Sequence, residues 1–327
     1  MPLRAVVLLR SVLLGRSIFL VRFVLLGSIL SLVLWACDAS PPPEGGGGQV
    51  APEDTGNAGA ETPPPHPGAT HPIRVEDDAG HTVVLEGAPI RVVSLVPSAT
   101  EILLALGQQD RLVGRTDFDE DPALASVPSV GGGLEPSIER IVSLHPDLVV
   151  HFRADSDLTT SRQLDRAGIP HVAIRPDGIR DVHRIIRLLG AIVHRDATAD
   201  SLDRALTARV EGVSRSVAEL DRPRVAFLLG GDPPLVAGPG TFLDELIQIA
   251  GGQNVFADLG ALYAPVNVEE VIRRDPRYLL AREGARISVA LAGIPVLRFP
   301  PEVEAPGLGL GDSAHMMAGA LHPGRLP

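Results

Sequence analysis

The sequence predicts an α/β protein with two lobes, each a mainly parallel sheet flanked by helices, joined by one long, rigid α-helix. Apolar runs alternate with helical segments through residues 73–327, a pattern typical of parallel sheets. One helix–turn–strand phrase occurs twice, as "ERIVSLHPDLVV" from Glu139 and "EEVIRRDPRYLL" from Glu269. Between the copies, residues 197–220 have the periodicity of a helix about 35 Å long. Two lobes related by pseudo-symmetry, with a ligand cleft between them, are therefore expected.

The N-terminal region reads as a targeting segment. Residues 1–36 contain four arginines and no acidic residue, and they end in the apolar run "FVLLGSILSLVLWA". Cys37, the only cysteine, follows directly. This predicts a lipoprotein signal peptide over 1–36 and lipidation of Cys37, the alternative being an uncleaved membrane anchor. Residues 37–72 are rich in Pro and Gly and predict a disordered tether, so the body would face outward from a membrane.

The first lobe is predicted over residues 73–195. Ser98 and Glu101 have the spacing of a capping box at the start of a helix that Gly107 ends. The expected strands are 92–96, 111–116, 147–152 and 171–174, after a hairpin over 73–87, and the expected helices are 98–106, 136–144, 157–167 and 177–194.

An interdomain helix is predicted over 196–221, and a second lobe over 222–327. One face of the helix carries an apolar stripe, and Pro223 prevents its continuation. In the second lobe, Thr241 and Asp244 suggest another capping box. The expected elements of this lobe are a strand at 224–229, a helix at 241–252, a helix and strand within 267–280, a strand at 292–299 and a helix at 311–322.

The composition and motifs disfavour two classes of function. The chain has 29 basic and 40 acidic residues, a net charge of −11, which disfavours nucleic-acid binding. The sequence has no P-loop, dinucleotide fingerprint, nucleophile elbow or zinc-site spacing. His151 is the one histidine at the carboxyl end of a predicted strand, and no nucleophile–base pair accompanies it. We therefore expect a monomeric binding protein without a metal site rather than an enzyme.

Several motifs together resemble one family. They are "DDAG", "RVVSLVPSATEILLALG", "SIERIVSLHPDLVV", "GPGTFLDELIQIAGGQNVFAD" and "VNVEEVIRRDP". Residues 73–327 resemble the periplasmic substrate-binding proteins of ABC transporters, in the cobalamin, siderophore and heme class, and most resemble its cobalamin branch. The resemblance implies no intrinsic cofactor and delivery of the ligand to an ABC permease dimer and its ATPase. It also implies that Glu139 and Glu269 dock onto permease arginines. The alternative is that each glutamate only stabilises the first turn of its helix.

The resemblance implies a corrinoid ligand, cobalamin, in the cleft. Phe118, Phe152 and Tyr263 match the aromatic cage of the family. Gly133 stands where a tryptophan is expected. The last cleft loop, "PPEVEAPGLGL", offers Glu302 and Glu304, of which Glu302 is the predicted ligand-binding residue, but lacks the tryptophan and arginine of the family.

Heme and a ferric siderophore are the alternative ligands. For heme, Tyr263 or His151 would ligate the iron, and Arg153, Arg175 or Arg282 would pair with the propionates. A siderophore would use the same arginines. A non-transporting sensor or scavenger, or an envelope enzyme, would be a different use of the same fold.

Overall fold

The computed structural model describes residues 72–153 and 158–325, all of which belong to one compact unit that spans residues 64–327. The predicted signal peptide, Cys37 and residues 37–71 of the predicted tether lie outside the described residues. Among residues 72–153 and 158–325, no helix combines the length and the apolarity that crossing a bilayer requires.

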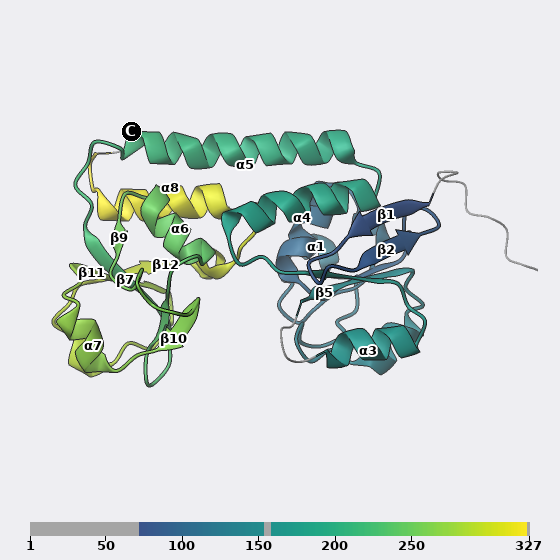
Figure 1. Cartoon of the computed structure of the whole chain (residues 1–327), viewed down its shortest axis with the longest axis horizontal. Coiled ribbons are helices and arrows are strands. Elements are labelled where there is room, and N and C mark those ends of the chain that lie inside the picture. The colour runs from purple at the N-terminus through teal and green to yellow at the C-terminus, as the bar shows by residue number, and fades with distance from the viewer. Residues whose placement is uncertain (1–71, 154–157, 326–327) are drawn as a thin grey trace, which may run out of the picture. The chain divides into compact units, whose positions relative to one another are not determined.

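The N-terminal lobe contains a four-stranded sheet in the order β4-β3-β5-β6 with every pair parallel, as predicted. An antiparallel hairpin, β1–β2, precedes it. Figure 1 shows the hairpin beside α4. The strands are β1 (Ile73–Glu76), β2 (Thr82–Leu85), β3 (Val92–Ser94), β4 (Leu112–Gly114), β5 (Leu148–Phe152) and β6 (His171–Ile174). The helices are α1 (Pro97–Ala105), η1 (Gln109–Arg111), η2 (Pro122–Leu124), α2 (Ile138–Ser143), α3 (Thr159–Arg166) and α4 (Ile179–Ile192).

The C-terminal lobe has a mixed sheet in the order β10-β8-β7-β11-β12, with β9 also paired to β7. The pairs of β7 with β9 and β11, and of β11 with β12, are parallel, whereas β8 and β10 run antiparallel to their neighbours. The strands are β7 (Arg224–Gly230), β8 (Leu235–Ala237), β9 (Gln253–Asn254), β10 (Tyr263–Pro265), β11 (Tyr278–Arg282) and β12 (Val296–Phe299). The helices are α6 (Phe242–Ile249), α7 (Val268–Arg273), η3 (Val289–Leu291), η4 (Pro301–Glu304) and α8 (Leu310–Leu321).

The interdomain helix is α5 (Asp196–Ser216), which packs on α4 of the first lobe and on α6 and α8 of the second (Figure 1). Its predicted stripe faces the core: Leu206 and Val213 are buried, and Leu202 and Val210 pack against the same cluster. Burial of this stripe holds the helix to both lobes, because each buried aliphatic side chain contributes about 1.5–3 kcal/mol. The helix ends at Ser216, five residues before the predicted end at residue 221.

The helix–turn–strand sequence pattern that begins at Glu139 and again at Glu269 forms the same structure in both lobes. The helices α2 and α7 each have six residues, and each is capped by the side chain that precedes it, Ser137 or Asn267. The turn after each helix contains a non-glycine residue with positive φ, 46° at His145 and 48° at Asp275. The parallel strands β5 and β11 follow. Equivalent residues are 130 positions apart (269 − 139), so each lobe contains one copy of the same helix–turn–strand unit.

One predicted capping box is wrong and the other is partly right. The helix α1 begins at Pro97, and no side chain caps it. Glu101 instead accepts a hydrogen bond from the backbone N–H of Leu308 in the other lobe (3.1 Å). Thr241 does cap α6, because its hydroxyl accepts from the N–H of Asp244 (3.1 Å). The Asp244 carboxylate, however, accepts from the side chain of Asn254 (2.8 Å).

Candidate functional site

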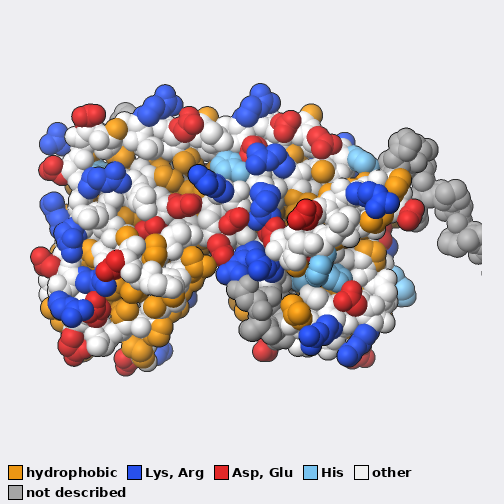
Figure 2. All heavy atoms as spheres, viewed as in Figure 1, with side chains coloured by type: hydrophobic (Ala, Val, Ile, Leu, Met, Phe, Trp, Pro, Cys, Tyr) orange, Lys and Arg blue, Asp and Glu red, His pale blue; other side chains and the backbone are white. Residues whose placement is uncertain are grey.

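A cavity of about 550 Å³ lies between the lobes and is the candidate ligand site. Most of its wall comes from the carboxyl ends of β5 and β6, the loop before α2 and the start of α3, and the rest from the second lobe. The position at the carboxyl ends of the strands is what the crevice rule for parallel sheets predicts. Figure 2 shows the hollow between the lobes, with hydrophobic side chains on the side of the C-terminal lobe and basic side chains on the other. The lining residues are Gly133, Leu134, Glu135, His151, Phe152, Arg153, Thr160, Ser161, Arg175, Pro176, Asp177, Phe242, Tyr263 and Pro306.

Of the residues predicted to bind a corrinoid or heme, Phe152, Arg153, Tyr263, His151 and Arg175 line this cavity. Phe118, Glu302 and Arg282 do not. The Phe118 side chain is 70% exposed and extends toward Gly132, and Glu302 is exposed in η4. The roles of all these residues in binding remain predictions.

The absence of a side chain at position 133 has a local cause. A Cβ atom on Gly133 would lie 2.3 Å from the carbonyl oxygen of Leu95, closer than real Cβ contacts allow. The backbone of the loop therefore packs directly on the segment that follows β3. No aromatic residue fits at this position unless the loop moves, and the neighbouring Leu134, whose side chain is 74% exposed, lines the cavity instead.

Replacing Gly133 by alanine is expected to lower the free energy of unfolding by about 1–3 kcal/mol, because the new methyl group must displace backbone. Chemical denaturation measures this difference. Gly132→Ala is the matched control, since the nearest atom to a Cβ there is Phe118 Cε2 at 3.9 Å. Equal stabilities of the two variants would contradict the close approach.

Tyr263 lies among acidic groups on the wall contributed by the C-terminal lobe. Burial, together with the negative charges of Asp177 and Glu304, raises the pKa of Tyr263 to about 12. The phenol therefore stays protonated at neutral pH. Its hydroxyl can donate a hydrogen bond to a ligand acceptor.

Glu304, rather than Glu302, is the partly buried carboxylate of the last cleft loop. Its Oε2 lies 3.2 Å from Nε of Arg282. Its Oε1 is buried and has no hydrogen-bond partner within residues 72–153 and 158–325. Burial raises the pKa of Glu304, and the nearby Arg282 partly opposes that effect. In η4 the intervening Val303 points into the core, so Glu302 and Glu304 have different environments.

A second, smaller cavity of about 310 Å³ shares Arg153, Arg175 and Asp177 with the first. Asp78, Asp181 and Arg184 complete its lining. Charges on its wall are paired: Arg175 Nε lies 2.5 Å from Asp177, and Arg184 contacts both Asp78 and Asp181. The equal number of acidic and basic side chains makes this a polar subsite without a net charge.

His151 is a buried residue of the cavity wall and belongs to a chain of polar contacts. Its Nδ1 lies 2.8 Å from the carbonyl oxygen of Phe152, and its Nε2 lies 3.0 Å from Nδ1 of His171. The Nε2 atom of His171 is 3.2 Å from Asp165. Because a carbonyl oxygen only accepts, Nδ1 of neutral His151 carries the proton and Nε2 accepts from His171. Burial lowers the pKa of His151 to about 4. Both ring nitrogens of His151 thus have partners.

Three hydrogen bonds, each donated by a backbone N–H group, join the lobes. The N–H of Phe242 donates to the carbonyl of Asp177 (2.7 Å), and both residues line the cavity. Glu245 of α6 accepts from the N–H of Ile179 (2.6 Å) and so caps α4 from the opposite lobe. The bond between Leu308 and Glu101 is the third. Two residues of the cavity wall, Asp177 and Phe242, are therefore coupled directly across the lobe interface.

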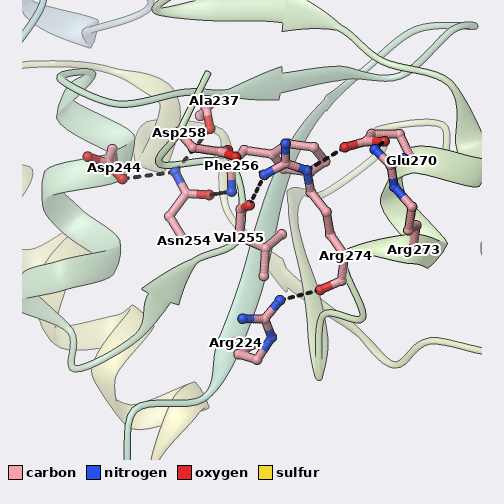
Figure 3. A network of polar contacts seen from close by, with 10 residues as sticks. All are labelled: Arg224, Ala237, Asp244, Asn254, Val255, Phe256, Asp258, Glu270, Arg273 and Arg274. Carbon is pink, nitrogen blue, oxygen red and sulfur yellow. Dashed lines mark hydrogen bonds and ion pairs between the residues drawn. The ribbon is translucent and has the colours of Figure 1, made fainter. Parts of the chain in front are cut away.

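Glu139 and Glu269 occupy equivalent exposed positions in the first turns of α2 and α7. Within residues 72–153 and 158–325, neither carboxylate has a hydrogen-bond or ion-pair partner. Glu270 differs, because it pairs with Arg274 (2.7 Å) and Arg273 (Figure 3). Arg274 also contacts Asp258 and stacks on Phe256, so this network fixes α7 on its lobe. Of the two adjacent glutamates, only Glu269 is available to a partner.

Few metal ligands converge in this region. Within the part of the chain that the structure describes, no group of three or more His, Cys, Asp or Glu side chains is arranged to hold a metal ion.

Two α/β lobes around a ligand-sized cavity define a bilobed solute-binding protein, a class of binders rather than enzymes. The chain belongs to the periplasmic binding protein family, whose model matches residues 92–294. Proteins of this family carry a transported ligand rather than an intrinsic cofactor.

Known proteins similar to the chain include binders of different ligands. A cobalamin-binding protein of Halobacterium salinarum is 32% identical over 237 residues, which are 68% of this chain and 63% of that protein. An uncharacterized ABC transporter substrate-binding lipoprotein of Bacillus subtilis, YvrC, is 24% identical, covering 66% of this chain and 70% of its own. The apo structure of the periplasmic heme-binding protein RhuT of Roseiflexus sp. RS-1 has a TM-score of 0.62 at 27% identity, covering 72% of this chain and 98% of that one.

Proposed function

We propose that the protein captures a corrinoid, cobalamin, in the cavity between its lobes and delivers it to an ABC importer. The observation that carries this proposal is the interlobe cavity with Phe152 and Tyr263 on opposite lobes. Aromatic side chains give a large, flat ligand much apolar contact without covalent chemistry. The similarity to a cobalamin-binding protein of Halobacterium salinarum supports the same ligand.

Heme is the second candidate, because the heme-binding RhuT has a similar fold. Two observations favour the corrinoid over it. Asp177 and Glu304 help to raise the pKa of Tyr263 to about 12, which opposes the phenolate form that would bind ferric iron. His151 has partners at both ring nitrogens, so it offers no lone pair to iron without losing a contact. A corrinoid brings its own metal and needs no ligand from the protein.

Delivery to a permease would use Glu139 and Glu269. Their equivalent positions give each lobe one unpartnered carboxylate, and a charge-assisted contact with arginine is worth about 1.5–3 kcal/mol when water is excluded. The similarity to an ABC transporter substrate-binding lipoprotein supports this partner.

The proposal includes an envelope location. The arginine-punctuated apolar segment and Cys37 support cleavage after residue 36 and lipidation of the cysteine. The body would then face outward from the membrane on a Pro- and Gly-rich tether. Mass spectrometry of the protein from its own cells checks the acylated cysteine.

Titration of the purified full chain in detergent with cyanocobalamin and with hemin, followed by heat and absorbance, tests the ligand. Saturable binding of cyanocobalamin is expected, together with a loss of about 10-fold or more in affinity for Tyr263→Ala and for Phe152→Ala. The exposed Val84, on the β1–β2 hairpin, provides the control Val84→Ala. Saturable binding of hemin alone would replace the corrinoid with heme as the ligand.

A further inference from the structure

The two repeated helices carry the same surface pattern beyond their glutamates. In α2, Val142 follows Glu139 by three residues and is 43% exposed. In α7, Ile272 follows Glu269 by three residues and is 51% exposed. Residues three apart on a helix are neighbours on one face. Each lobe therefore presents one unpartnered carboxylate beside one β-branched apolar side chain.

Packing against the lobe fixes the orientation of both helices, α2 and α7. Ile141 and Val271, at equivalent positions, are completely buried in their lobes. The network around Arg274 further fixes α7 (Figure 3). A buried residue in each helix thus turns its successor, Val142 or Ile272, outward. The exposure of these two side chains therefore follows from the way in which each helix packs on its lobe, and not from fraying of a helix end.

The helices that carry the two patches lie on one side of the molecule. The helix α2 packs against α3. In Figure 1, α3 and α7 both lie on the side of their lobes that is away from α5. A partner that covers this side of both lobes would therefore lie next to α2 and α7 together.

We infer that Glu139 with Val142, and Glu269 with Ile272, are two copies of one docking patch for a two-fold symmetric partner that presents a cation beside an apolar surface at each site. This inference rests on the proposed delivery function and adds the apolar half of each contact. Two equivalent patches on one chain fit a partner with two equivalent sites, such as a permease dimer. The apolar side chain excludes water from the neighbouring ion pair, which strengthens it, since exposed pairs contribute little.

The test replaces the apolar residues and leaves the glutamates in place. The double variant Val142→Ser/Ile272→Ser is introduced at the chromosomal locus, and uptake of labelled cyanocobalamin by whole cells is measured. Uptake is expected to fall by about 10-fold, with thermal stability and ligand affinity unchanged. Val84→Ser, at a similarly exposed position on the hairpin (39%), is the matched control and is expected to leave uptake unchanged.

An exchange variant, Val142→Ile/Ile272→Val, keeps an apolar side chain in both patches and is expected to retain uptake. Normal uptake by Val142→Ser/Ile272→Ser, in cells where Glu139→Ala/Glu269→Ala abolishes it, would overturn the inference and leave the proposed function intact. Normal uptake by both double variants would overturn docking through these helices altogether.

Discussion

Replacing Glu139 and Glu269 together by alanine is expected to reduce ligand uptake by about 100-fold or more, without changing the affinity for the ligand. Each carboxylate is exposed and unpartnered in the described part of the chain, and neither lines the cavity. Loss of two charge-assisted contacts removes about 3–6 kcal/mol of docking free energy. Uptake by whole cells and ligand titration of the purified protein measure the two quantities separately.

The matched control removes a glutamate elsewhere. Glu211 is exposed on α5, away from both repeated helices, and Glu211→Ala is expected to leave uptake unchanged. The alternative role of the two glutamates, stabilising the first turns of α2 and α7, predicts a lower melting temperature instead. A variant that melts earlier yet transports normally would support that alternative.

Acidification from pH 6.5 to 4 is expected to destabilise the fold by about 3 kcal/mol through His151 alone. Burial lowers the pKa of His151 in the folded state to about 4, from 6.5. Between these values the unfolded chain binds more protons than the folded chain, so stability falls as the pH falls. The contribution is fully present above pH 6.5 and fully lost below about pH 4. Asp77, Asp165 and His171 act on the same ring.

Urea denaturation at several pH values measures how the free energy of unfolding changes with pH. In His151→Asn the pH dependence between 6.5 and 4 is expected to flatten, whatever the absolute stability of the variant. His145→Asn is the control, because His145 is exposed and asparagine tolerates its positive φ. An unchanged slope in His151→Asn would show that other groups dominate the acid response.

Much of the fold follows from local patterns in the sequence. The alternation of strands and helices, the stripe along α5 and the duplicated phrase all rest on periodicity, and the structure confirms them. The sequence patterns do not predict the strands β8 and β10, which are only three residues long. Gly230 and Gly231, both with positive φ, let the chain reverse after β7 and pair with it.

The failed capping box has a different cause. The spacing of Ser98 and Glu101 fits a local motif, but Glu101 bonds to Leu308, which is 207 residues away in the chain. Contacts at that separation depend on how the lobes meet. No pattern within one helix reveals them.

Site residues at the ends of strands can be predicted from the sequence. Site residues whose position depends on a turn or on strand register cannot. Phe152 ends β5 and Arg153 follows it, so a parallel sheet brings both residues to the cavity. The choice between Glu302 and Glu304 depends on the winding of η4, which places Glu304 beside Arg282. The pairing of His151 with His171 depends on the register of β5 and β6, since the two residues lie on adjacent strands. The spacing of residues in the sequence predicts neither the position of Glu304 nor the pairing of His151 with His171.

The packing of α5 on both lobes has a consequence for competition at the transporter. A helix that bridges the lobes, together with the bonds from Ile179 and Leu308 across the interface, resists a wide change in the distance between α2 and α7. Ligand-free and ligand-bound copies would then present almost the same docking surface to the permease. Empty copies would occupy the importer as inhibitors, so that overproduction of the protein in ligand-poor medium slows import.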